Sequence, residues 1–226
     1  MKKNIQQNYL IINFKTYLEG SGAKAEKLAK IADRIAKKSG KNIILVVQET
    51  DIHRISSIVS IPVFSEHLDP IEYGAHTGKI LADSLKFNGA EGVVLNHSED
   101  RFNLEQIERS IKIAKKHKLK IILCANDVNQ SAALSMFKPD FLAVEPPELI
   151  GGNISVSKAK PEIIIDTVNK VRQSHKKQII LCGAGIKSGE DVKKAIELGT
   201  QGVFVASGIV KSKTPEKKIK ELVKFL

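Results

Sequence analysis

The chain has 226 residues, of which 42% are hydrophobic and 27% charged, and its formal net charge is +11 at neutral pH. These proportions are typical of a globular protein. The sequence contains no run of 18 apolar residues, so no membrane-spanning helix and no membrane partner are expected. Residues 1–8 are polar and lack the apolar core of a signal peptide, and we therefore expect a cytoplasmic location.

The basic charge balance raises the possibility of a nucleic-acid-binding protein. However, the lysines are spread along nearly all the predicted helices, aromatic residues make up only 5%, and tryptophan is absent. We therefore interpret the charge as a solvated surface that attracts an anionic metabolite, and we expect no nucleic-acid partner. Cys124 and Cys182 each end an apolar run and are predicted to be core residues. The sequence has no CxxC and no paired Cys/His spacing, so we expect no metal site.

Short apolar runs recur along the whole chain. They are rich in Val, Ile and Leu and show little polar alternation, which is typical of parallel strands buried on both faces. The runs occupy residues 9–13, 43–47, 61–65, 92–95, 120–124, 141–144, 178–182 and 202–205.

Helical patterns lie between most of these runs. Apolar residues at three-and-four spacing predict strong helices over 28–36, 104–114, 164–171, 192–196 and 219–226. Weaker helices are predicted over 51–59, 78–87 and 129–137. Asn103 and Ser188 are placed to cap the helices that follow them.

Eight strands alternating with helices predict an α/β fold of the (β/α)₈ type, a closed parallel eight-stranded barrel with outer helices. We expect a single catalytic domain over residues 1–226; an open doubly wound sheet is the alternative. Lys-Ile-Ile-Leu-Cys at 120–124 resembles Gln-Ile-Ile-Leu-Cys at 178–182. These runs would be strands five and seven, and alternate strands share layers in a barrel core.

The carboxyl ends of barrel strands hold the active site. The first strand ends at Asn13-Phe14-Lys15, the fourth at Asn96-His97-Ser98-Glu99, and the sixth at Glu145. A lysine that ends an apolar strand is expected to point into an anionic site, and the carboxylate and imidazole at the same rim are candidate catalytic groups. The alternatives are a lysine that reaches solvent, a core histidine and a solvent-facing loop glutamate.

Small residues follow the last two strands, as Gly183-Ala184-Gly185 and Ala206-Ser207-Gly208. Backbone N–H groups in such turns can approach a phosphate, and barrels often bind phosphate at these two loops. The alternative is a pair of ordinary tight turns. From the residues alone we predict a phosphate-handling barrel enzyme.

The segment after Glu145 reads as a closing lid. Two prolines stiffen one end, a short apolar tip follows, and two glycines loosen the other end. The predicted lid residues are Pro146, Pro147, Glu148, Leu149, Ile150 and Gly151.

Taken together, these motifs resemble triosephosphate isomerase, specifically its short archaeal-type branch, over essentially the whole chain. The motifs are Asn-Phe-Lys-Thr-Tyr at 13–17, His-Thr-Gly at 76–78, Asn-His-Ser-Glu at 96–99, Ala-Val-Glu-Pro-Pro-Glu-Leu-Ile-Gly at 143–151, Cys-Gly-Ala-Gly-Ile at 182–186 and Ala-Ser-Gly at 206–208. The resemblance implies a TIM barrel that interconverts dihydroxyacetone phosphate and glyceraldehyde 3-phosphate.

The resemblance also implies roles for individual residues. Glu145 would move the proton, His97 would donate hydrogen bonds to the substrate oxygens, and Lys15 would stabilise the enediolate, with Glu99 as a supporting acid. Triosephosphate isomerases are themselves the known example of a neutral imidazole in this role, beside a helix N-terminus; here Ser98-Glu99 would begin that helix. The implied substrate-binding residues are Asn13, Phe14, Lys15, Ile150, Gly185, Ala206 and Ser207.

The reaction needs no cofactor and no metal, and its partner is a small phosphorylated triose. Family members form homodimers or homotetramers, and Thr77 would reach the neighbouring subunit. Two departures from the family pattern stand out: Asp100 replaces a common arginine, and the lid ends in Gly151-Gly152-Asn153. Two rival functions remain open on the residues, a phosphate-binding synthase of the tryptophan pathway and a basic barrel that binds nucleic acid.

Overall fold

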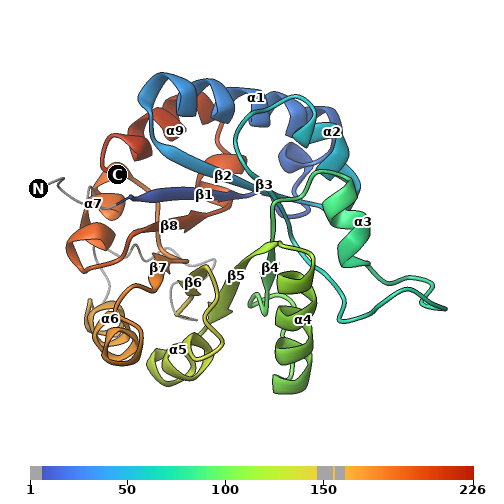
Figure 1. Ribbon diagram of the computed structural model, residues 1–226. Coiled ribbons are helices and arrows are strands. Elements are labelled where there is room, and N and C mark those ends of the chain that lie inside the picture. The colour runs from blue at the N-terminus through green and yellow to red at the C-terminus, as the bar shows by residue number, and fades with distance from the viewer. Residues whose placement is uncertain (1–6, 147–154, 156–160) are drawn as a thin grey trace, which may run out of the picture.

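The computed structural model describes residues 7–146, 155 and 161–226 (Figure 1). Eight parallel strands close into a barrel in sequence order, and the last pairs with the first. The strands are β1 (Tyr9–Asn13), β2 (Asn42–Val47), β3 (Val63–Ser65), β4 (Gly92–Leu95), β5 (Lys120–Ala125), β6 (Phe141–Val144), β7 (Ile179–Cys182) and β8 (Gly202–Val205). The predicted closed barrel is confirmed, and the open sheet is excluded.

Helices form a ring around these strands (Figure 1). They are α1 (Gly22–Ser39), α2 (Ile52–Ser56), α3 (Ala82–Phe87), α4 (Leu104–Lys116), α5 (Val128–Ser135), α6 (Glu162–Ser174), α7 (Gly189–Glu197), α8 (Ser207–Val210) and α9 (Pro215–Val223), with 3-10 turns η1 (Leu18–Gly20) and η2 (Glu49–Asp51). The sequence did not predict α8, because four residues are too few to show a helical period. In the described part of the chain, no helix has both the length and the apolar character needed to cross a bilayer.

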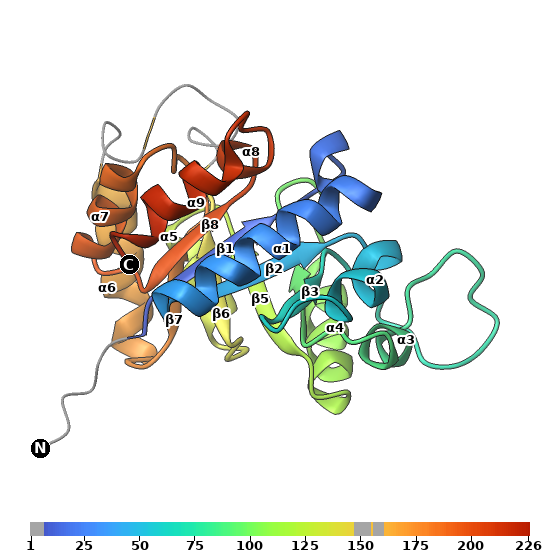
Figure 2. The same cartoon turned by 90° about the horizontal axis from the view of Figure 1, so that it is seen from above.

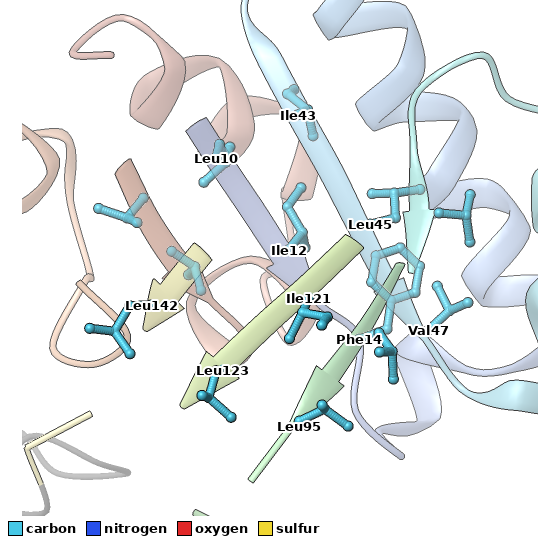
Figure 3. Packing of buried hydrophobic residues seen from close by; sticks show 14 of the residues in the cluster. Leu10, Ile12, Phe14, Ile43, Leu45, Val47, Leu95, Ile121, Leu123 and Leu142 are labelled. Atoms are coloured by element: carbon cyan, nitrogen blue, oxygen red, sulfur yellow. The ribbon is translucent and has the colours of Figure 1, made fainter. Parts of the chain in front are cut away.

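The strands are buried on both faces, as their unbroken apolar runs predicted. One alternating set of side chains fills the barrel and includes Ile11, Val46, Phe64, Ile122 and Phe204. The other set packs outward against the helices (Figure 3). Because both faces are dry, the backbone at each strand end is held rigidly, which fixes the side chains that follow.

The repeated pentapeptides do not occupy equivalent layers, so that prediction is wrong. Cys124 of β5 faces the barrel interior together with Ile122, whereas Cys182 and Ile180 of β7 face the outer helices. In β7 it is Leu181 that points inward, next to Ala143 in the register. A shift of one residue exchanges the two faces of a strand, and an apolar run tolerates either phase. Both cysteines are buried and unpaired, as predicted.

The loop between β3 and α3, residues 66–81, extends away from the barrel (Figure 2). The sequence predicted a helix from residue 78, but α3 begins at Ala82. Within the loop, Asp69 accepts hydrogen bonds from the Ile80 backbone N–H at 2.7 Å and from the Lys79 ammonium at 3.1 Å. These bonds hold the base of the loop in a non-helical conformation.

The predicted caps are present. The Asn103 side chain accepts from the Gln106 N–H at 2.8 Å, and the Gln106 side chain accepts from the Asn103 N–H at 2.9 Å. Ser188 and Asp191 form the same reciprocal arrangement at the start of α7. Each pair satisfies backbone donors that the first helical turn leaves free.

Asn103→Ala is expected to lower the free energy of unfolding by about 1 kcal/mol, because it removes an exposed cap and no packing. Urea unfolding of the variant beside Asn103→Ser, which keeps a cap acceptor, measures the difference. Equal loss in both variants would contradict the cap as the cause.

Candidate active site

A cavity of about 440 Å³ opens at the carboxyl ends of the strands. Its lining comes from segments that are far apart in the sequence, after β1, β4, β6, β7 and β8. The lining residues are Asn13, Lys15, Tyr17, His97, Ser98, Glu99, Glu145, Gly183, Ala184, Gly185, Ile186, Lys187, Phe204, Val205, Ala206, Ser207 and Gly208. A larger hollow of about 800 Å³ lies beside α9, but its lining contains no comparable group of a base, an imidazole and a cation.

Lys15 is held in a strained turn at the end of β1. Its φ angle is 47°, a left-handed conformation that costs energy for a residue with a Cβ. The buried Asn13 side chain stabilises the turn, because its Oδ1 accepts the Lys15 backbone N–H at 3.0 Å. This turn aims the lysine into the cavity instead of letting it reach bulk solvent.

The Lys15 ammonium donates to Glu99 Oε1 at 2.8 Å. The lysine side chain is only 16% exposed, whereas the glutamate is 61% exposed. The pair joins the loops after β1 and β4 across the mouth of the cavity. Glu99 therefore holds the ammonium in place while leaving it on the cavity wall.

His97 follows a second left-handed residue, Asn96, whose φ angle is 58°. The Asn96 side chain donates to the Cys124 carbonyl at 2.9 Å and accepts the Phe102 N–H at 3.0 Å, which fixes the turn after β4. The Glu99 backbone N–H donates to His97 Nδ1 at 3.2 Å. Because Nδ1 accepts this bond, a neutral imidazole carries its proton on Nε2.

Glu145 stands directly after β6 and is 3% exposed. Its Oε1 lies 3.1 Å from His97 Nε2, and its Oε2 accepts the Ser98 N–H at 3.3 Å. Burial raises the pKa of the Cys124 thiol well above its usual value, and the Glu145 carboxylate raises it further. Cys124 therefore stays a neutral thiol beneath the carboxylate.

Gly183 makes room for Glu145, a role that sequence reasoning missed. A Cβ at this position would lie 2.6 Å from Glu145 Cγ and 2.9 Å from the Val144 carbonyl oxygen, both far inside van der Waals contact. The sequence singled out this glycine only as part of a phosphate turn. Its close approach to the neighbouring strand becomes visible only when the barrel is closed.

The two small-residue turns face the same cavity. Gly185 has a φ angle of 74°, and Ala206 and Ser207 lead into the short helix α8. Barrel phosphate sites commonly combine these two loops with the N-terminus of a short extra helix. These two turns and the start of α8 therefore lie on the side of the cavity next to the carboxylate and the imidazole.

The side chain of Phe14, a predicted substrate-binding residue, lies outside the cavity. Its side chain is fully buried in the outer core near Val47 (Figure 3) and does not line the cavity. Gly20 packs closely against the Phe14 backbone: a Cβ on Gly20 would lie 2.4 Å from the Phe14 carbonyl oxygen. Phe14 thus anchors the loop that carries Lys15, and its predicted contact with substrate stays a prediction.

Other predictions have mixed outcomes. Of the lid, only Pro146 is described, and it is buried; residues 147–151, including Ile150, lie outside the described residues. The predicted helix at Ser98-Glu99 is wrong, since these residues form a turn and α4 begins at Leu104. Thr77 is exposed on the projecting loop, so its contact with a neighbouring subunit stays a prediction.

Asp100 pairs with His67 Nδ1 at 3.0 Å, away from the Lys15–Glu99 pair. The next residue, Arg101, donates to the Asn96 carbonyl at 2.6 Å. Although position 100 is not an arginine, the turn after β4 still has a cationic donor, which is Arg101. Sequence reasoning missed Arg101 and the cavity residue Lys187, because neither belongs to a quoted motif. It also gave no role to Tyr17, which lines the cavity and ends the quoted motif at 13–17.

Comparison with known proteins agrees with this geometry. Residues 8–225 match the family model described as triosephosphate isomerase. The triosephosphate isomerase of Methanothermus fervidus is 47% identical over 214 residues, covering 95% of this chain and 96% of that protein. The enzyme of Methanocaldococcus jannaschii is 46% identical over 217 residues, with 96% and 99% covered.

A crystal structure of triosephosphate isomerase from Bartonella henselae superimposes with a TM-score of 0.74 at 14% identity and covers 97% of each chain, which supports the fold. The family model and the archaeal relatives span nearly all of the sequence. The chain therefore belongs to the triosephosphate isomerase family.

Proposed function

We propose that this chain interconverts dihydroxyacetone phosphate and glyceraldehyde 3-phosphate, with Glu145 as the base, His97 as the electrophile and Lys15 as the stabilising cation. The observation that carries the assignment is the pairing of Glu145 Oε1 with His97 Nε2 at 3.1 Å, in a cavity that Lys15 also lines. Membership of the family places the reaction in glycolysis and gluconeogenesis.

The reaction begins when the Glu145 carboxylate takes a proton from the carbon next to the substrate carbonyl. The electron pair moves onto the carbonyl oxygen and gives an enediolate. Glu145 then returns the proton to the neighbouring carbon. A buried carboxylate suits this step because a water-poor site does not solvate it heavily.

His97 acts on the oxygens. The Glu99 N–H at Nδ1 leaves the Nε2–H free to donate to the carbonyl and hydroxyl oxygens of the substrate. A neutral imidazole can exchange protons between two oxygens without separating charge. The Nε2 atom lies 3.1 Å from Glu145 Oε1, so a bound substrate would separate the two groups.

Lys15 supplies a fixed positive charge where the enediolate forms. Its strained turn and its Glu99 partner place the charge before the reaction, so little reorganisation is needed. The turns at Gly185 and at Ala206-Ser207 would hold the phosphate. The substrate would thus be bound through its phosphate, while the two reacting carbons face Glu145.

The direct test is a coupled assay with dihydroxyacetone phosphate or glyceraldehyde 3-phosphate. Isomerisation that follows saturation kinetics without added metal or cofactor would support the assignment. A preparation that folds but shows no isomerisation, and that binds heparin in a salt-sensitive manner, would favour the basic-scaffold alternative.

His97→Gln is expected to lower kcat by on the order of 10²-fold, because an amide cannot pass a proton between two oxygens. The melting temperature should change little, since the imidazole lines the cavity and meets the barrel core at its end, in a T-shaped contact with Phe204. Paired assays and thermal melts decide the matter. Unfolding of the variant would point instead to a structural histidine.

A homo-oligomer, dimer or tetramer, and a cytoplasmic location complete the proposal. The loop that carries Thr77 supports the oligomer, because it extends away from the barrel and exposes both Thr77 and Tyr73, where a neighbouring subunit could contact them (Figure 2). Light scattering coupled to size exclusion, on the wild type and on Thr77→Arg, would test both the state and the loop.

A further inference from the structure

Glu66 is an acidic residue that the reaction scheme leaves unused. It follows β3 directly, and its backbone N–H donates to the Val47 carbonyl at 3.1 Å, which fixes it at the carboxyl end of the barrel. Its Oε1 is enclosed and has no hydrogen-bond partner among the described residues. An ionised carboxylate in such a place is costly, because no hydrogen bond from the described residues replaces the water lost at this oxygen.

The charged neighbours of Glu66 come from three elements. Glu49, in η2 after β2, accepts the Ser65 hydroxyl at 2.9 Å, and Glu99 reaches in from the loop after β4. Lys15 faces it from the loop after β1. Nearby, His67 pairs with Asp69 and Asp100, and His97 faces Glu145, so neither imidazole compensates the carboxylates.

Burial raises the pKa of Glu66 to about 8, and the charges of Glu49 and Glu99 add to the effect. The ammonium and the backbone N–H of Lys15 act in the opposite direction but are weaker. At neutral pH, Glu66 is therefore mostly a neutral acid.

We propose that Glu66 is a positioning residue for Lys15: neutral in the working enzyme, it leaves the ammonium to the substrate, and once ionised in alkaline solution it competes for that ammonium. The inference rests on the proposed role of Lys15. It does not require Glu66 to touch substrate, and Glu66 does not line the cavity.

The physical consequence concerns the potential at the cavity. With Glu66 neutral, Lys15 is balanced mainly by Glu99, whose carboxylate is 61% exposed and well screened by water. A second carboxylate, enclosed and less solvated than Glu99, would cancel the field of the ammonium more completely. Binding of an anionic substrate and stabilisation of the enediolate would both weaken.

The test compares Glu66→Gln with the wild type from about pH 6.5 to pH 9.5. A phosphate ester already carries most of its second charge at the bottom of this range, since its second pKa is about 6. We expect the ratio of wild-type to variant kcat/KM to fall by about tenfold through pH 8. The dissociation constant of glycerol 3-phosphate, an unreactive three-carbon phosphate, should change in parallel when measured by calorimetry.

Two further variants sharpen the test. Glu49→Gln removes a like charge, so the inflection should move to lower pH. Glu91→Gln, an exposed residue at the opposite end of the neighbouring strand β4, should follow the wild type. Superimposable profiles for wild type and Glu66→Gln, in both turnover and binding, would overturn the proposal.

A readout independent of the isomerase reaction is the carboxyl titration itself. In protein labelled with ¹³C at the glutamate carboxyl, one signal should titrate near pH 8 and be missing from Glu66→Gln. The raised pKa also means that folding takes up a proton, so wild-type stability falls between about pH 4.5 and pH 8. The melting temperature of Glu66→Gln should gain on the wild type over that interval.

These measurements separate two kinds of failure. Absence of turnover with a titrating Glu66 and altered anion binding would count against the isomerase and for the Lys15–Glu66 coupling. Normal turnover with no signal titrating near pH 8 would count against Glu66 alone.

Discussion

Glu145→Gln is expected to lower kcat by about 10³-fold, because a general base typically contributes 10² to 10⁴ and an amide cannot accept the proton. The fold should persist. Gln is isosteric with Glu, and its carbonyl oxygen can still accept from His97 Nε2 or from the Ser98 N–H, where the carboxylate accepts now. Loss of activity without loss of structure is thus the specific expectation for this residue.

Glu145→Asp provides a graded comparison. The carboxylate remains but retreats by roughly 1 Å, and a displacement of that size is expected to lower kcat by on the order of 10²-fold. Glu162→Gln, an exposed change at the start of α6, is the matched control that should leave kcat unchanged. Near-normal turnover in Glu145→Gln would refute Glu145 as the base.

Both variants also need thermal melts. Gly183 packs against Glu145 so closely that a Cβ would lie 2.6 Å from Glu145 Cγ. The side chain therefore occupies a fixed slot, and the aspartate variant leaves a small void there. A drop of a few degrees in melting temperature for Glu145→Asp, and less for Glu145→Gln, would agree with that packing.

Most of the barrel was predictable from the sequence because its strands are dry on both faces. β1, β4, β6 and β8 have the bounds that their apolar runs predicted. β3 is shorter than its run, and α3 is shorter than its helical pattern. In that region Asp69 bonds to the Ile80 backbone and stabilises a loop, which a local pattern cannot reveal.

The phase of each strand was not predictable for the same reason. When every residue of a strand is apolar, nothing in the sequence says which set points inward. Cys124 and Cys182 end matching pentapeptides but lie on opposite faces of the barrel wall. Only the register between neighbouring strands, Cys124 with Ala143 and Ala143 with Leu181, fixes the phase.

The sequence predicted those residues of the candidate site that are polar or charged and closely follow an apolar strand. Lys15, His97 and Glu145 each follow an apolar run, and closing the barrel brings them to one cavity. The burial of the Phe14 side chain was not predictable, because a motif does not say which of its side chains turns toward the core. Gly183 and Glu66 act through neighbours that are distant in the chain, so their roles appear only in three dimensions.

Lys15→Ala is expected to lower kcat/KM by about 10³-fold, since removal of one preorganised electrostatic group typically costs 10² to 10³ and the substrate also loses its cation. Both kcat and KM should suffer. The ammonium would bind the anionic substrate in the ground state and would stabilise the enediolate more strongly in the transition state. A change confined to KM would mean that Lys15 only attracts substrate.

The fold should tolerate this change. The Lys15–Glu99 pair has a largely exposed partner, so its net contribution to stability is expected to be below about 1 kcal/mol. Lys15→Gly should melt higher than Lys15→Ala, because glycine relieves the strain of a φ angle of 47°. The two variants should nevertheless be equally inactive, which separates the backbone conformation from the charge.

Lys24→Ala, an exposed change on α1, controls for the loss of one positive charge from a chain of net charge +11. If the general basic surface drew in the substrate, Lys24→Ala and Lys15→Ala would both raise KM, and both effects would fade with added salt. A loss that is specific to Lys15 and persists in kcat at high salt is what a fixed cation beside the reacting oxygen requires. If Lys15→Ala kept the kcat of the wild type, the proposed role of Lys15 in stabilising the enediolate would be wrong. Glu145 and His97 would then have to account for the chemistry.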